Sequence, residues 1–163
     1  MNPWQLSKSG SESGEQMALF CWAAKAQAIG FAAAMNEDAY KLALGIPSDP
    51  AIPELKWLFH IPNGGSRGDT ARSRAIEGGR MKAEGVKPGI LDVAWLLARP
   101  KYAGLLIEMK KPSLKSERNK LAGLSAEQLE FGNFAMDQQF CVRLCYTWTE
   151  AAKVVQSYYE GTI

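Results

Sequence analysis

Two acids and a lysine stand in apolar runs of this sequence. Glu108 and Lys110 close one run, and Asp92 lies in another, residues 90–95, sixteen residues before Glu108. Alternate side chains of a strand share a face, so Glu108 and Lys110 point the same way. Because such charges are costly to bury, we expect the two acids to hold a divalent cation, with Lys110 beside bound water or phosphate. The alternatives are a solvent-facing Glu108–Lys110 pair on an edge strand and a structural bridge from Asp92 to an arginine.

The composition bounds the class of protein. With 163 residues, 47% hydrophobic and 22% charged, the chain has room for one folded core and is not disordered. No apolar stretch approaches the roughly 20 residues that cross a bilayer, and the N-terminus lacks a signal-peptide pattern. We therefore expect a cytoplasmic protein without membrane contact. Cys21, Cys141 and Cys145 have no CxxC spacing and are expected to be reduced thiols.

Positive charge is concentrated around the two acids. From Lys56 to Lys120 there are fourteen Lys or Arg against six Asp or Glu, and elsewhere five against eleven. On charge alone a solvated basic face explains this as well as a polyanionic partner does, but the position around Asp92 and Glu108 favours DNA. We expect two arms that bind phosphates without reading sequence. The residues are Asn63, Arg67, Arg72, Arg74, Arg80 and Lys82 in the first arm, and Lys111, Lys115, Arg118 and Lys120 in the second.

Helical and strand patterns alternate along the chain, which predicts an α/β fold with a sheet flanked by helices. Residues 1–12 read as a flexible, serine-rich tail and residues 13–163 as one domain. The expected helices are 14–34, 36–44, 70–84, 125–138 and 149–159, and the expected strands are 55–61, 140–146 and the runs around Asp92 and Glu108. In the first helix the expected apolar face is Met17, Phe20, Cys21, Ala24 and Ala28.

Four short motifs, in this order and spacing, resemble the VRR-NUC branch (virus-type replication–repair nuclease) of the PD-(D/E)XK superfamily. They are residues 60–65 (HIPNGG), 85–92 (GVKPGILD), 106–110 (LIEMK) and 124–128 (LSAEQ), and the resemblance covers about residues 11–160. It implies an α/β, restriction-endonuclease-like core with a mixed central sheet flanked by helices. Each motif alone is weak, so the order and spacing carry the resemblance.

The resemblance also implies roles for single residues. Asp92 and Glu108 resemble the two metal-binding acids, and the backbone carbonyl of Met109 resembles the oxygen that often completes the metal shell. Lys110 matches the lysine that activates water or stabilises charge on the phosphate. Leu91 departs from the pattern, because many relatives have proline there; that proline shapes the strand entry and binds nothing.

Two more catalytic residues are implied outside the strands. Glu15 resembles a first-helix acid that reaches the metal directly or through water, with Glu12 as a nearby competitor. A first-turn acid is also favoured by the helix dipole alone. Gln128 corresponds to a glutamine beside the catalytic cleft, although it also fits a capping box with Ser125. His60, the only histidine, is expected to be structural or to contact DNA.

By this resemblance the protein is a Mg²⁺- or Mn²⁺-dependent, structure-selective DNA endonuclease of a bacterial or phage-infected cell, with a role in DNA repair or recombination. Stand-alone relatives include homodimers that cut four-way (Holliday) junctions, so a homodimer on branched or duplex DNA is expected. The alternatives are a non-catalytic or partner-dependent DNA-binding module with the same fold, and a nuclease directed at flaps or ends. A nucleotide cofactor is not expected, because residues 64–68 (GGSRG) lack the lysine and hydroxyl of a P-loop.

Overall fold

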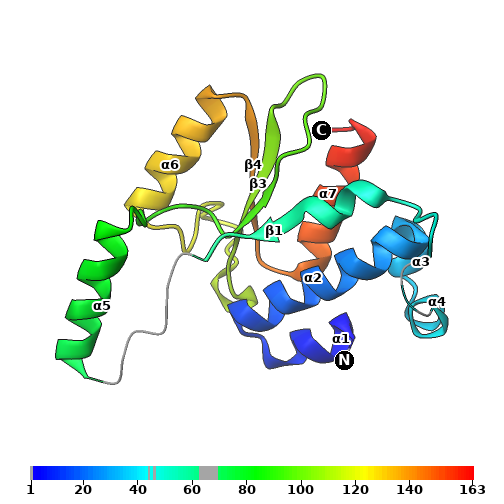
Figure 1. Ribbon diagram of the computed structural model, residues 1–163, viewed down its shortest axis with the longest axis horizontal. Helices are drawn as coiled ribbons and strands as arrows, with labels where there is room; N and C mark the ends of the chain where they lie inside the picture. Colours follow the sequence, from blue (N-terminus) through cyan, green and yellow to red (C-terminus); the bar gives the residue numbers. More distant parts are fainter. Residues whose placement is uncertain (1, 44, 46, 63–69) are drawn as a thin grey trace.

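A computed structural model describes residues 2–43, 45, 47–62 and 70–163, with only the backbone of Arg72 and Arg74. Its sheet has the spatial order β1 (Leu58–His60), β2 (Val93–Trp95), β3 (Gly104–Met109) and β4 (Phe140–Cys145). β2 is antiparallel to both β1 and β3, whereas β3 and β4 are parallel. Parallel neighbours need a crossover connection, and α6 (Ala126–Asp137) provides it (Figure 1). The predicted α/β fold with a mixed, helix-flanked sheet is confirmed.

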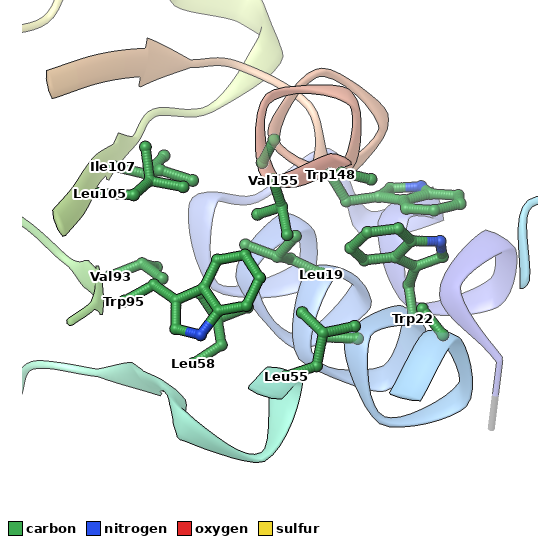
Figure 2. Close-up of a cluster of buried hydrophobic side chains, with 14 of the residues drawn as sticks. Leu19, Trp22, Leu55, Leu58, Val93, Trp95, Leu105, Ile107, Trp148 and Val155 are labelled. Carbon is green, nitrogen blue, oxygen red and sulfur yellow. The ribbon is translucent and has the colours of Figure 1, made fainter. Parts of the chain in front are cut away.

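The alternating side chains of β3 separate two cores. Leu105, Ile107 and Met109 belong to the larger core, which α2 (Glu12–Ile29) and α7 (Trp148–Glu160) cover. Figure 2 shows part of this core, with Leu19 and Val155 between the strand residues and the pair Trp22 and Trp148. Leu106 belongs to a smaller core with Ala135 of α6. By the same alternation, Glu108 lies on the α6 face of the sheet.

The buried face of α2 differs from the predicted one. Ala18, Leu19, Trp22 and Ala26 are buried, whereas Met17 from the predicted face is exposed. Both sets have helical spacing, so periodicity alone did not decide between them. The large Trp22 and the small alanines fit closely against the sheet and α7, and this packing sets the rotation of the helix.

The region after α2 forms shorter elements than predicted. Gly30 has φ +84° and ends α2 at Ile29, before α3 (Phe31–Ala34) and α4 (Glu37–Leu42). The first three residues of the predicted strand 55–61 belong instead to a 3₁₀ helix, η2 (Pro53–Trp57), which buries Leu55 and leaves three residues for β1.

Residues 2–12, within the segment predicted to be a flexible tail, have regular secondary structure. These residues form α1 (Pro3–Leu6), the 3₁₀ helix η1 (Ser7–Ser9) and the start of α2. The Trp4 ring packs edge-to-face on Tyr40 and Trp148, at centroid distances of 5.5 and 5.4 Å. Serine content suggested mobility, but the two ring contacts of the half-buried Trp4 outweigh it, because an aromatic side chain removes a large apolar area from water.

The helix predicted at 70–84 is confirmed as α5 (Ala71–Ala83), with a capping box between Thr70 and Ser73. None of its described side chains is buried, and Figure 1 shows α5 projecting away from the sheet. A further 3₁₀ helix, η3 (Pro112–Leu114), begins the basic loop after β3. No helix in the described part of the chain is both long and apolar enough to cross a membrane.

Candidate active site

Strand pairing brings the two predicted metal-binding acids together. Val93 pairs with Ile107, and the same register continued by one residue sets Asp92 opposite Glu108. Asp92 Oδ2 accepts a hydrogen bond of 2.9 Å from the Met109 backbone N–H. The Asp92 carbonyl accepts bonds from Ile61 N–H at 2.7 Å and from His60 Nδ1 at 2.9 Å. The end of β1 therefore fixes the backbone that carries Asp92, and His60 has a structural role here.

Glu108 is buried beneath the site, with 1% of its surface exposed. Its Oε1 accepts hydrogen bonds from Lys110 Nζ, at 2.5 Å, and from Gln128 Nε2. Its Oε2 is buried and has no hydrogen-bond partner. Burial raises the pKa of Glu108 to about 7, opposed by Lys110 and assisted by the negative charges of Asp92 and Glu12. An orphaned buried oxygen beside a second acid is a feature that a bound cation would explain.

Lys110 is held as an ammonium group between two acids. Besides Glu108, its Nζ lies 3.9 Å from Glu12 Oε2. Burial acts to lower the pKa of Lys110, but the bond to Glu108 and the nearby acids outweigh it and raise the pKa. A Cβ on Gly123 would lie 3.3 Å from Lys110 Cδ, and Gly123 has φ +88°. This glycine lets the loop after β3 pass close over the apolar part of the lysine side chain.

The structure brings Glu12, not Glu15, into the cluster. Glu15 is buried, and its Oε2 accepts a 2.7 Å hydrogen bond from the Trp148 N–H at the start of α7. Glu12 is one turn earlier, at the tip of α2, where it faces Lys110. Burial raises the pKa of both acids; Lys110 opposes the shift at Glu12, and the Trp148 N–H opposes it at Glu15. The corrected apolar face of α2, running from Glu15 through Trp22, is the signal that identifies Glu15 as a buried structural acid.

Gln128 combines the two roles that the sequence left open. Its Oε1 accepts a 3.0 Å hydrogen bond from Ser125 N–H, and Ser125 Oγ accepts one of 3.2 Å from Gln128 N–H. This capping box fixes the first turn of α6. Because the Gln128 Nε2 also donates to Glu108, the cap sets the orientation of a carboxylate in the cluster.

The predicted basic arms are only partly described. Asn63 and Arg67 lie outside the described residues, and Arg72 and Arg74 are placed on α5 by their backbone alone. The exposed members are Arg80 and Lys82 on α5, and Lys111, Lys115, Arg118 and Lys120 in the loop after β3.

Lys115 has a protein partner, because its Nζ lies 2.6 Å from Glu150 Oε1. The Tyr146 hydroxyl also donates a 2.8 Å bond to the Ala122 carbonyl. These two contacts tie the basic loop to the β4–α7 connection.

A divalent cation fits the donors at the end of the sheet. No three His, Cys, Asp or Glu side chains in the described ranges converge to form a metal site by themselves. A metal site here therefore needs a backbone oxygen in addition to the acid side chains. The N–H and C=O of one strand residue point to the same side, so the Met109 carbonyl faces the side on which its N–H bonds Asp92. The Asp92 carboxylate, the Met109 carbonyl and Glu108 Oε2 are hard oxygen donors of the kind that Mg²⁺ and Mn²⁺ prefer.

The fold is similar to that of a solved structure titled "VRR_NUC domain protein". The match covers 92% of this chain and 88% of that chain, with a TM-score of 0.57 and 20% sequence identity. At this identity the likeness concerns the fold, and it confirms the predicted VRR-NUC type of architecture. No family model and no curated protein matches the sequence.

Proposed function

We propose that this protein is a metal-dependent endonuclease that hydrolyses phosphodiester bonds in branched DNA. The observation that carries the proposal is the convergence of Asp92, Glu108, Lys110 and Gln128 at one end of the sheet, with Glu108 Oε2 left unpartnered. The solved neighbour with this fold is named as a VRR_NUC domain protein, which favours nuclease chemistry.

Asp92, Glu108 and the Met109 carbonyl are the residues that would hold Mg²⁺ or Mn²⁺. Such a cation lowers the pKa of bound water and polarises the phosphate. Gln128 and Lys110 both bind Glu108 Oε1, which leaves the other oxygen, Oε2, as the one that would bind the cation. In this assignment Glu12 replaces Glu15 as the acid from the first long helix.

Lys110 stabilises negative charge and does not act as a base. Its raised pKa keeps it protonated at neutral pH. An ammonium group next to the scissile phosphate is worth most as the negative charge on phosphorus oxygens grows in the transition state. Glu12 and Glu108 hold this ammonium in place before substrate arrives.

The finer parts of the proposal concern the substrate and the assembly. The exposed lysines and arginines of α5 and of the loop after β3 bind phosphates on both sides of the site. The protein acts as a homodimer, because a four-way junction needs two related nicks and a two-fold axis provides two equivalent sites.

The test is cleavage of a labelled panel of DNA substrates: a four-way junction, a flap, a splayed arm, a linear duplex and a single strand. Each is incubated with Mg²⁺, Mn²⁺ or EDTA. We expect paired nicks in the junction with metal and none with EDTA. Glu108→Gln should lower the rate roughly 100-fold or more without weakening DNA binding.

The matched control is Glu130→Gln, an exposed acid of α6 outside the cluster, which should cut like the wild type. Cleavage confined to flaps or ends would keep the chemistry and reject the junction. Tight DNA binding without cleavage under either metal would reject the enzyme and identify a DNA-binding module with a nuclease fold.

A further inference from the structure

A cavity of about 310 Å³ lies between α6 and the sheet, directly beside Glu108. Its volume is at the lower end of the roughly 300–1,000 Å³ that is typical of small-molecule pockets. Its walls are mostly apolar, with Leu91 from the segment before β2, Val142 from β4, Leu129 and Met136 from α6, and Leu124 from the loop before α6. None of the roles assigned above uses this cavity.

Four polar side chains also line the cavity. Glu108 and Gln128 belong to the proposed catalytic cluster, so the cavity and the cluster share a wall. Asn133 and Arg143 are the other two. An amide and a guanidinium group between apolar walls suit a flat, heterocyclic ligand, because the amide can bond its polar edge while its faces contact the walls.

Gly132 keeps one wall of the cavity free of a side chain. It lies inside α6, where glycine is less favourable than alanine. A Cβ at this position would be 3.7 Å from Val142 Cγ1, an ordinary contact, so alanine would fit. A larger side chain would extend into the cavity.

We propose that this cavity receives the base of a nucleotide next to the scissile phosphate. The inference rests on the proposed function, which places that phosphate at Glu108 and Lys110. A base in an intact duplex is stacked and paired and cannot enter a pocket, whereas a base at a branch point leaves the stack at lower cost. The cavity thus gives selectivity for branched DNA without any motif that reads sequence.

The first readout is binding without cleavage. A set of four-way junctions carries 2-aminopurine at one branch-point nucleotide each, and their fluorescence is followed as protein is added in EDTA. We expect the fluorescence to rise with the wild type and with Gly132→Ala, because the base leaves its stacked neighbours. With Gly132→Leu, which fills the cavity, the rise should be lost.

The second readout is the nicking rate with an abasic analogue at the same nucleotide. The wild type should slow at least about fivefold, because base contacts of this kind contribute that much or more. Gly132→Leu should already be slow and should lose little more on the abasic junction, since the two changes remove one interaction. Thermal unfolding checks that the variant folds. If Gly132→Leu does not fold, the substitute is Met136→Ala, at an exposed position in the cavity wall. It should weaken both readouts.

The outcomes separate this inference from the proposed function. Metal-dependent nicking with no fluorescence change and no effect of the abasic site would overturn the base-binding cavity and leave the nuclease intact. A fluorescence rise that Gly132→Leu abolishes, in a protein that never cuts, would support the cavity and reject catalysis. Unchanged DNA readouts together with binding of an apolar peptide to the cavity would assign it to a protein partner and overturn the inference.

Discussion

The two acids at the start of α2 have different neighbours. Glu12 faces the Lys110 ammonium, whereas Glu15 accepts a hydrogen bond from the first turn of α7. Both are glutamates in the first turn of one helix, so the sequence gives them nearly the same surroundings. Their contacts distinguish Glu12, which lies beside the proposed catalytic lysine, from Glu15, which joins two helices.

The pair Glu12→Gln and Glu15→Gln tests this division. Glu12→Gln should lower the cleavage rate roughly tenfold or more, because loss of such a supporting contact typically costs 10- to 100-fold, and should leave stability nearly unchanged. Glu15→Gln should lower the free energy of unfolding by about 1–3 kcal/mol, since it weakens a buried bond to a charged acceptor. Urea unfolding and single-turnover cleavage measure both effects. The opposite result, with cleavage lost only in Glu15→Gln, would return the catalytic role to Glu15.

Glu108 makes the stability of the metal-free protein depend on pH. Its folded pKa of about 7 lies above the ordinary value of 4.5, so the folded state binds this proton more tightly than the unfolded state. The resulting stabilisation is complete below pH 4.5 and is lost as the pH rises through about 7. Over this window the wild type should lose about 1–3 kcal/mol relative to Glu108→Gln, which has no such proton.

The measurement is urea unfolding of both proteins in EDTA between pH 4.5 and 8. The difference between the two curves isolates Glu108 from the other carboxyl groups. A constant difference across the range would mean that Glu108 titrates normally in the folded protein.

At the scale of helices and strands, the features that depend on neighbouring residues could be predicted from the sequence, whereas those that depend on packing could not. The capping boxes at Thr70 and Ser125 depend on neighbouring residues, so the starts of α5 and α6 could be placed. The alternation of β3 put Glu108 and Lys110 on one face. The rotation of α2 and the order of residues 2–12 depend on Trp22 and Trp4 meeting distant side chains, and no local pattern contains that information.

The projecting helix α5 should contribute to DNA affinity but not to chemistry. It buries none of its described side chains, and a helix of this length is marginal in isolation, so a polyanion bound to its exposed Arg80 and Lys82 side chains would stabilise it. Arg80→Ala combined with Lys82→Ala should reduce the slope of log affinity against log salt by about 2. The cleavage rate at saturating protein should stay the same.

Fluorescence anisotropy at several salt concentrations gives the slope. The control is Lys101→Ala, an exposed lysine in the β2–β3 connection, at the opposite end of these strands from Asp92 and Glu108. An equal loss of slope in the control would mean that any surface charge has this effect and that α5 is not a specific arm.

On the scale of the whole molecule, the sheet leaves an apolar edge beside β1. Trp57 and Leu96 are 67% and 65% exposed, and Phe59 lies near them. With Trp95, these side chains line a hollow of about 270 Å³. Among the described strands β1 pairs only with β2, so its outer edge is open to a second chain. We propose that a second copy of this protein binds here, because the same edge from two copies can pair about a two-fold axis.

Trp57→Glu should therefore separate the proposed dimer. Tryptophan at the centre of an interface commonly contributes 2 kcal/mol or more, and a charge there adds a desolvation cost, so dimerisation should weaken about 30-fold or more. Sedimentation velocity at micromolar concentration measures the change. Leu42→Glu is the matched control, because Leu42 is also an exposed apolar side chain, on α4, away from this edge. Since each nick needs one site and paired nicks need two, the Trp57 variant should keep single-strand nicking and lose simultaneous cutting of both strands.

A wild type that is monomeric at this concentration and still makes paired nicks would show that one chain cuts the two strands in turn. The dimer would then have no role in cleavage.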